Sequence, residues 1–246
     1  MHVLHIITGL GDGGAEGVLY RLIRADRIHR HTVVSLMDNG KYGPLLHQLS
    51  VPVICLNMGK KQQIPLAPFK LWKVIRQNKP DLVQTWMYHA DFLGGIIARL
   101  AGVPKIFWGI RHSSLEPGHS SRLTIILFHI NAWLSHWIPT AILCCANRAR
   151  EVHVASGYDH DKFHIIANGY DLRRFYPDPT VRDRFRNQLH IADNVPLIGM
   201  VARFNPQKDH RSLICALALV KQNLPHFFCL LIGKDLDTTN IEVVKQ

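Results

Sequence analysis

The sequence predicts an α/β fold built on a parallel sheet. Short β-branched runs alternate with longer stretches whose apolar residues have helical spacing, and this alternation favours a parallel sheet covered by helices on both faces. The chain has 246 residues, of which 47% are hydrophobic and 19% charged. This composition excludes a disordered, collagen-like or coiled-coil chain, and the length corresponds to between one and two domains.

The elements of the first part can be assigned in order along the chain. The apolar and β-branched pattern predicts strands at 2–8, 31–37, 51–57, 81–86 and 105–111. Helical spacing predicts helices at 15–27, 68–78 and 90–102. In the helix over 68–78 we expect an apolar face made of Phe69, Leu71, Trp72 and Ile75.

The stretch 123–146 is apolar enough to raise the question of a membrane span. A spanning helix needs about 20 predominantly apolar residues, and this stretch is interrupted by His129, Asn131, Ser135, His136 and Pro139. Because polar groups are costly at bilayer depth, we predict instead a buried helix that is followed, after Pro139, by a buried strand.

The composition changes at 168–196, which is charged and contains prolines. The strand–helix pattern then restarts, with a strand at 196–204, a helix at 209–223 and a strand at 226–233. Two strands and one helix are too few for an independently stable α/β domain. The predicted organisation is a Rossmann-like domain over 1–170, a linker with a short helix over 171–195, and the incomplete start of a second Rossmann-like domain over 196–246.

The positive charge is concentrated in the first part of the chain. Residues 1–150 contain seventeen basic and seven acidic residues, giving +10, whereas residues 151–246 contain twelve and eleven, giving +1. Such an excess suits a nucleic acid, an acidic membrane surface or a phosphorylated small molecule. No nucleic-acid-binding motif accompanies the charge, so we expect no nucleic-acid partner.

The cysteines and the N-terminus bear on the compartment. Five cysteines, two of them adjacent and none in a C-x-x-C motif, make a disulfide framework unfavourable and favour the cytoplasm. The N-terminus has no basic region before its apolar run, so we predict a strand there and no signal peptide.

A glycine-rich turn between the first strand and the first helix reads G-x-G-x-x-G from Gly9 to Gly14. Glycines at such a turn let backbone amides approach a phosphate at a helix N-terminus. Asp38 ends the second strand, where a dinucleotide-binding fold places its ribose-binding acid. An NAD-dependent oxidoreductase is therefore one hypothesis, and a turn that needs glycine only for its dihedral angles is the alternative.

Other polar residues follow predicted strands, at the ends where open parallel sheets bind ligands. His89 follows one strand, and a histidine there can donate to or polarise a hydroxyl. The planar guanidinium of Arg203 and the ammonium group of Lys208 can both bind phosphate oxygens. Arg111 and His112 could bind a phosphate of an acceptor. The alternatives are that His89 only packs in the core, that Arg203 and Lys208 are ordinary solvated surface cations, and that Arg111 and His112 belong to a polar loop.

No metal site is predicted. The chain contains no H-E-x-x-H, and its histidine pairs lack cysteines or carboxylates at ligand spacing. It also contains no G-x-S-x-G motif of a serine hydrolase.

Four segments in order are similar to motifs of family 4 glycosyltransferases. They are GLGDGGAEGVLYRL at 9–22, the strand–His–helix segment at 86–105, IIANGYDLRRF at 165–175, and IGMVARFNPQKDHRSLICAL at 198–217. The resemblance implies a GT-B fold, with two Rossmann-like domains. It also implies a retaining, metal-independent transfer of sugar from a nucleotide donor, UDP-linked, to a glycan or lipid-linked acceptor of a cell-surface polysaccharide, with no further cofactor.

The resemblance also implies roles for residues. His89 corresponds to the histidine near the transferred sugar. The donor diphosphate would be met by Gly13, Gly14, Arg203 and Lys208, and we assign Arg111 and His112 to the acceptor. The protein would be cytoplasmic, and its cationic first domain could hold it peripherally at the inner face of the membrane.

One family feature has no counterpart here. The E-x7-E segment that holds the donor is missing, since Glu242 is the only glutamate after Glu151. We therefore expect a truncated chain with weak or absent transferase activity. A non-catalytic module that binds an acidic membrane or an acceptor is a further alternative.

Overall fold

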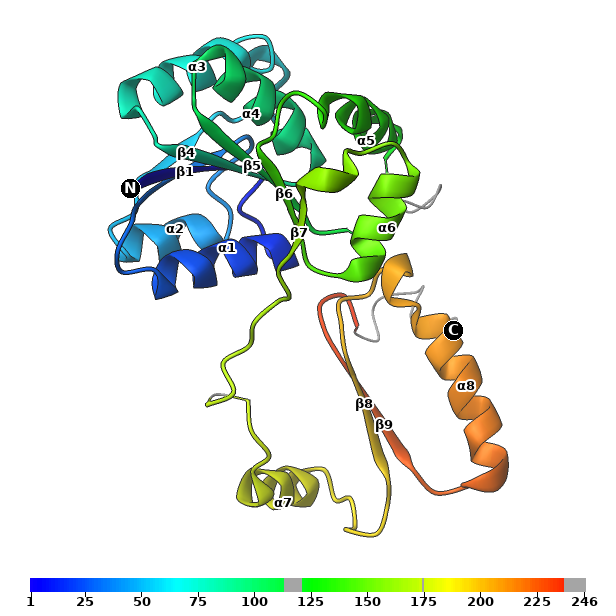
Figure 1. Cartoon of the computed structure of the whole chain (residues 1–246). Coiled ribbons are helices and arrows are strands. Elements are labelled where there is room, and N and C mark those ends of the chain that lie inside the picture. Colours follow the sequence, from blue (N-terminus) through cyan, green and yellow to red (C-terminus); the bar gives the residue numbers. More distant parts are fainter. Residues whose placement is uncertain (113–120, 174, 237–246) are drawn as a thin grey trace. The chain divides into compact units, whose positions relative to one another are not determined.

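The computed structural model describes residues 1–112, 121–173 and 175–236 (Figure 1). The chain divides into two compact units, Met1–Gly169 and Tyr170–Gln246. Each unit contains its own parallel strands.

The first unit is built on a seven-stranded parallel sheet with the order β3-β2-β1-β4-β5-β6-β7. Its strands are β1 (His2–Ile7), β2 (Arg30–Ser35), β3 (Val53–Cys55), β4 (Leu82–Trp86), β5 (Lys105–Ile110), β6 (Ala141–Cys144) and β7 (Phe163–Ile165). The order reverses between β1 and β4, and all six residues of β1 are buried because neighbouring strands and helices surround it. The predicted α/β class with a parallel sheet is confirmed.

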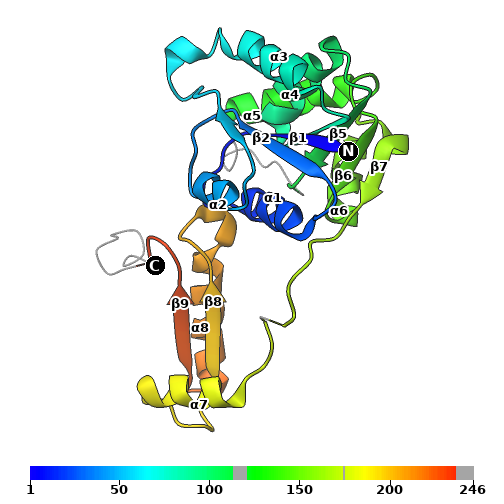
Figure 2. The ribbon, with the colours of Figure 1, turned by 90° about the vertical axis from the view of Figure 1, so that its left-hand side faces the viewer.

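Helices cover both faces of this sheet. They are α1 (Gly14–Ala25), α2 (Tyr42–Gln48), α3 (Ala67–Asn78), α4 (Tyr88–Leu100), α5 (Arg122–Leu134) and α6 (Asn147–Ala155), with short 3-10 turns η1 (Lys61–Gln63) and η2 (His160–Lys162). Figures 1 and 2 show α1 and α2 on one side of the sheet and α3, α4 and α5 on the other. Two apolar clusters fill the layers, one beneath α1 and α2 and a larger one beneath α3, α4 and α5.

Two predictions about apolar helix faces hold only in part. In α3 the buried positions are Ala67, Leu71 and Ile75, whereas Phe69 and Trp72 point to solvent. Ala67, Leu71 and Ile75 are four residues apart and form one narrow stripe that packs on the sheet. Phe69 and Trp72 flank this stripe and are therefore exposed to solvent.

The helix within 123–146 is likewise buried on one side only. Leu127, Phe128, Asn131 and Ala132 of α5 are buried, but its outer face is apolar and exposed at Leu123, Ile126, Ile130 and Trp133. The strand after Pro139 is present as β6. No helix in the described ranges has the length and apolarity that crossing a membrane requires.

The second unit has a parallel pair of strands, β8 (Leu197–Val201) and β9 (Phe228–Ile232). It also contains α7 (Pro179–Gln188), the 3-10 turn η3 (Pro206–Lys208) and α8 (His210–Asn223). The Asp178 carboxylate accepts a hydrogen bond at the start of α7, and Asp209 does so at the start of α8. Such caps satisfy amides that have no partner inside the helix.

Candidate active site

The functional residues predicted in the first unit all lie just beyond the carboxyl ends of strands. The glycine turn follows β1, His89 follows β4, and Arg111 with His112 follows β5. Since the sheet is parallel throughout, these ends share one edge. The strand order reverses between β1 and β4, and a reversal of this kind is where open α/β sheets bind ligands.

The glycine turn leaves room beside its backbone. A Cβ built on Gly11 or Gly14 would meet no atom within 4 Å, and none of the turn's glycines has a left-handed φ. The interpretation that the turn needs glycine only for its dihedral angles is therefore wrong. Gly13 precedes α1 in an extended conformation and supplies no side-chain cap. A Cβ on Gly13 would meet the carboxylate of Glu16, a flexible side chain in the first turn of α1. The start of α1 is therefore open beside Gly11 and Gly14, where an anion could approach the backbone amides.

A second loop holds the glycine turn in place. The Leu10 carbonyl accepts a hydrogen bond of 2.9 Å from the Tyr42 amide, and Lys41 Nζ lies 2.8 Å from Asp12 Oδ1. Gly40 has a φ of +46°, and a Cβ there would collide with the Leu10 carbonyl. Gly40 therefore allows the two loops to approach one another closely.

Asp38 takes part in the same loop. Its Oδ1 accepts a 3.1 Å hydrogen bond from the Gly40 amide, and its carbonyl accepts one of 2.7 Å from Ser35 Oγ. These bonds form a local turn that presents Gly40 to the glycine turn. The structure thus provides a role for Asp38 that does not involve a ribose.

His89 stands in the first turn of α4, behind a strained backbone step. Met87 has a φ of 72°, and its amide donates a 3.0 Å hydrogen bond to the Gly109 carbonyl of β5. The His89 ring is half-buried, and burial lowers its pKa. No described side chain or carbonyl bonds to this ring, so a neutral imidazole keeps both nitrogens available to a ligand.

Asp91, two residues after His89 in the first turn of α4, connects three elements at this point. Thr85 Oγ1 of β4 donates a 2.5 Å hydrogen bond to Asp91 Oδ1, and the Gly109 amide of β5 also bonds to this carboxyl. Asp91 is 1% exposed, and burial raises its pKa. Sequence reasoning missed this residue, although a carboxylate two residues after His89 was visible in the pattern.

Arg111 is a predicted site cation that contacts with described residues hold in place. Its guanidinium lies 4.9 Å from the centre of the Trp86 ring, and its Nη1 donates a 3.1 Å hydrogen bond to Asn168 Oδ1. Burial lowers its pKa, and its buried Nε has no hydrogen-bond partner among the described residues. The side chain is half-buried, and no described carboxylate pairs with the guanidinium, so its charge is available to an anion.

His112 rests on an aromatic support. Its ring stacks on Tyr88 with centroids 5.9 Å apart, and burial lowers its pKa. Tyr88 is buried, and its hydroxyl donates a 2.9 Å hydrogen bond to His153 Nε2, because His153 Nδ1 donates to the Ala149 carbonyl at 2.6 Å. Trp86, Tyr88 and His153 were not singled out from the sequence, where their apolar or neutral character indicated only core packing.

Arg203 and Lys208 belong to the second unit. Arg203 follows β8 and Lys208 ends η3, and both side chains are exposed. Neither forms an ion pair with a described residue. The Phe204 amide between them donates a 2.9 Å hydrogen bond to the Lys234 carbonyl, which anchors the loop to the end of β9.

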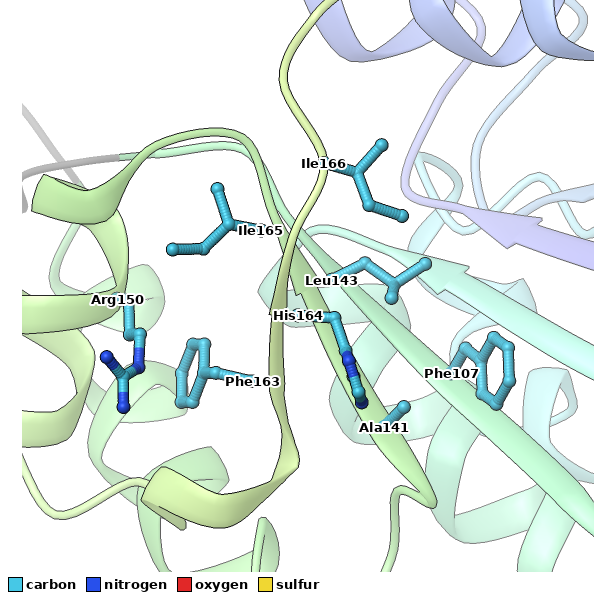
Figure 3. Close-up of a pocket in the computed structure, with 8 residues that line it drawn as sticks. All are labelled: Phe107, Ala141, Leu143, Arg150, Phe163, His164, Ile165 and Ile166. Carbon is cyan, nitrogen blue, oxygen red and sulfur yellow. The ribbon is translucent and has the colours of Figure 1, made fainter.

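A cavity of about 630 Å³ lies elsewhere in the first unit. Figure 3 shows its lining, made of Phe107, Ala141, Leu143, Arg150, Phe163, His164, Ile165 and Ile166. These residues come from β5, β6, α6, β7 and the residue after β7, and none of them is a predicted site residue.

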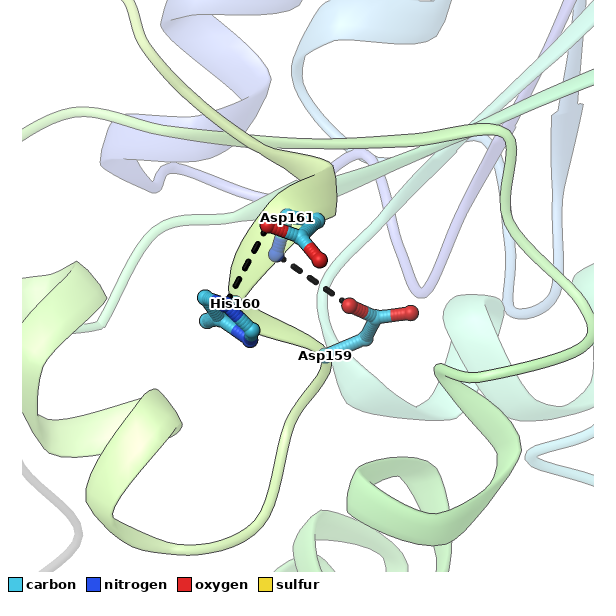
Figure 4. A group of neighbouring side chains, drawn as sticks. All are labelled: Asp159, His160 and Asp161. Atoms are coloured by element: carbon cyan, nitrogen blue, oxygen red, sulfur yellow. Dashed lines mark hydrogen bonds and ion pairs between the residues drawn. The ribbon is translucent and has the colours of Figure 1, made fainter.

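One cluster of potential metal ligands occurs in the described ranges, at Asp159, His160 and Asp161 (Figure 4). Its groups bond to one another and to neighbours. Asp159 Oδ1 accepts a 3.1 Å hydrogen bond from the Asp161 amide at the start of η2, and His160 Nε2 lies 3.2 Å from Asp161 Oδ1. Asp159 also lies 3.5 Å from Lys162 Nζ. These contacts show that the three side chains stabilise a turn. That the chain binds no metal remains a prediction.

Comparisons with known proteins agree with this fold. The sequence profile of Glycosyltransferase Family 4 matches residues 12–174. The chain is 27% identical over 241 residues to the "Putative glycosyltransferase EpsF" of Bacillus subtilis, covering 94% of this chain and 61% of that protein. It is 28% identical over 160 residues to an Escherichia coli UDP-Gal:alpha-D-GlcNAc-diphosphoundecaprenol alpha-1,3-galactosyltransferase, covering 65% of this chain and 41% of that enzyme.

Among solved structures, Anabaena HepE in complex with UDP-glucose superposes with a TM-score of 0.80 at 23% identity. The match covers 100% of this chain and 64% of that one. The GT-B-like fold class expected from the sequence is confirmed. The chain thus spans between two fifths and two thirds of the length of these relatives.

Proposed function

The chain belongs to glycosyltransferase family 4, and on this premise we propose that it forms part of a retaining glycosyltransferase of cell-surface polysaccharide synthesis. The enzyme would transfer a sugar from a UDP-linked donor to a glycan or lipid-linked acceptor at the inner face of the membrane. The first unit would receive the acceptor, and the second unit would contribute the first contacts to the donor.

The observation that carries this proposal is Arg111. A half-buried guanidinium that lies on Trp86, bonds to Asn168 and has no carboxylate partner among the described residues is suited to a phosphate. The E. coli relative is named for an acceptor that contains a diphosphate linked to a lipid. A phosphate of such an acceptor would pair with the Arg111 guanidinium. His112, which stacks on the Tyr88 ring, would lie beside that phosphate.

The donor assignment rests on class and on charge. The E. coli relative is named for UDP-Gal, and HepE forms a complex with UDP-glucose. A leaving nucleoside diphosphate develops negative charge, and fixed cations and amides stabilise such charge without a metal. We assign this role to Arg203, Lys208 and the amides at Gly13 and Gly14.

His89 would contact the transferred sugar. Burial keeps its imidazole neutral at neutral pH, so one nitrogen can donate a hydrogen bond and the other can accept one. Met87 and Asp91 would act as positioning residues, because they set where the first turn of α4 begins.

The acceptor assignment can be tested by calorimetry with a soluble N-acetylglucosaminyl diphosphate that bears a short alkyl chain. Arg111→Gln should weaken binding by about 10- to 100-fold, since a hydrogen bond to a charged group contributes roughly 1.5–3 kcal/mol. Arg24→Gln is the matched control, because Arg24 lies in the last turn of α1, at the opposite edge of the sheet. Equal binding by Arg111→Gln and the unmodified chain would contradict the assignment.

The donor assignment and the oxidoreductase hypothesis are separated by two titrations. We expect UDP to bind and the pair Arg203→Ala/Lys208→Ala to weaken it, whereas NADH should not saturate the protein. Saturable NADH binding that disappears in Asp38→Ala would favour the oxidoreductase instead.

A further inference from the structure

The segment that leads into α3, together with α3 itself, is strongly basic. No acidic residue occurs in the sequence between Asp38 and Asp81. The same stretch contains seven cations: Lys41, Lys60, Lys61, Lys70, Lys73, Arg76 and Lys79. Three of them, Lys70, Lys73 and Arg76, are exposed side chains of α3.

Large apolar side chains are exposed among these cations. Phe69 is 66% exposed, Trp72 41% and Leu66, at the start of α3, 50%. The Phe69 and Trp72 rings stack with centroids 6.3 Å apart, and the Arg76 guanidinium lies 6.0 Å from the Trp72 ring. We call Leu66, Phe69, Lys70, Trp72, Lys73 and Arg76 the α3 surface.

The position of the α3 surface relates it to the candidate site. The chain leaves the carboxyl end of β3 and passes through η1 before α3 begins, so the start of α3 lies at the same edge of the sheet as His89 and Arg111. Figure 1 shows α3 on the side of the sheet that faces away from α1 and α2.

We propose that the α3 surface binds the protein to an anionic phospholipid bilayer. Phe69 and Trp72 would enter the headgroup region, where amphipathic aromatic rings are stable, and Lys70, Lys73 and Arg76 would face the lipid phosphates. The purpose of this contact rests on the proposed function, since an acceptor with a lipid anchor must be reached at a membrane. The contact itself needs neither donor nor turnover.

The charge of this surface selects a bilayer over a protein partner of mixed charge. All charged residues of the described α3 surface are basic, and the exposed aromatic side chains lie between them. The exposed stripe of α5 differs, because only Arg122 and His129 accompany its apolar residues. Its chemistry does not distinguish a lipid from an apolar protein segment.

The test is cosedimentation of the full chain with vesicles of phosphatidylcholine alone or with 30% phosphatidylglycerol added. The protein should bind the anionic vesicles and dissociate as the salt concentration rises, since mobile ions screen the attraction. Lys70→Ala/Lys73→Ala/Arg76→Ala should weaken binding about 100-fold, because each cation near an anionic leaflet contributes roughly a fivefold factor. Phe69→Ser/Trp72→Ser should weaken binding without changing its salt dependence.

The matched control is Arg21→Ala/Arg24→Ala/Arg27→Ala. It removes the same charge from exposed positions in and just after α1, which lies on the other side of the sheet (Figure 2). Equal loss of binding in both triple variants would show that net charge acts without a defined surface, and would overturn the proposal. Each variant is first compared by thermal unfolding, so that a loss of folded protein is not counted as a loss of binding.

Two other outcomes would also overturn the proposal. The first is equal binding to neutral and anionic vesicles. The second is a dimer, seen by sedimentation velocity, that Phe69→Ser/Trp72→Ser dissociates while vesicle binding is unchanged, because the surface would then join two copies of the chain. Vesicle binding that persists in a protein that binds no UDP would support the surface and count against the proposed function alone.

Discussion

Buried histidines should make the first unit unstable in mild acid. His5 in the central strand β1 is 1% exposed, and burial lowers its pKa from 6.5 to about 3. Trp86 Nε1 donates a 3.3 Å hydrogen bond to His5 Nδ1, so His5 Nε2 carries the proton and donates to His31 Nδ1 at 3.1 Å. His153 is in the same situation, with a pKa lowered mainly by burial to about 4.

The sign of the effect follows from proton binding. In the folded state both histidines stay neutral down to their lowered pKa, whereas in the unfolded state they take up protons below about pH 6.5. Above pH 6.5 both histidines are neutral in both states, so the free energy of unfolding has its full value there. The contribution of each histidine is lost progressively as the pH falls toward 4 for His153 and toward 3 for His5.

The size of the loss can be worked out for pH 5. For each histidine that stays neutral in the folded state, the free energy of unfolding falls by about 1.4 kcal/mol per pH unit below 6.5. At pH 5 this amounts to roughly 2 kcal/mol for each residue and roughly 4 kcal/mol for the pair. Domains of this size are stable by about 5–15 kcal/mol, so the effect is large. Asp26, whose pKa is lowered chiefly by a hydrogen bond from the Ile28 amide, acts only at a pH below this window.

The assay is urea unfolding between pH 7.5 and pH 5. His5→Gln and His153→Gln should each reduce the slope of the unfolding free energy against pH by about one proton below pH 6. His129→Gln, an exposed position of α5, is the matched control and should leave the slope as it is. If His5→Gln kept the slope of the unmodified chain, the histidine would be protonated in the folded state and the reasoning would be refuted.

Two further predictions concern the loops at the candidate site. Gly40→Ala should destabilise the protein by about 1–3 kcal/mol in urea unfolding, because its φ of +46° and the nearby Leu10 carbonyl exclude a Cβ. Gly14→Ala, which meets nothing within 4 Å, should change stability by less than about 1 kcal/mol and instead weaken UDP binding; the reverse pattern would refute the assignment. Thr85→Val should cost about 1–3 kcal/mol, since it leaves the buried Asp91 carboxyl without its 2.5 Å partner, and an unchanged midpoint would contradict that.

Several elements could be predicted from local pattern alone. The strands β1, β4 and β5 are mostly apolar, and most of their residues are buried on both faces. Such runs are recognisable in a sequence. Three elements were missed, namely α2, α6 and β7, because each is short and has a weak apolar pattern. The outward orientation of Phe69 and Trp72 was missed as well, since spacing does not show which side of a wide apolar face meets the sheet.

The sequence by itself determined the fold class, the family and the order of the residues that follow strand ends, among them His89, Arg111 and Arg203. These depend on local periodicity and on short motifs, which a linear chain displays directly. Only the tertiary structure brought Trp86 and Asn168 to Arg111, joined Thr85 to Asp91 and set Gly40 against Leu10. These contacts join different elements, often distant in sequence, and they exist because parallel strands bring their carboxyl ends to one edge. Tertiary packing also buried one stripe of α3 and left its aromatic and basic residues exposed. This exposed surface is the basis of the proposed membrane contact.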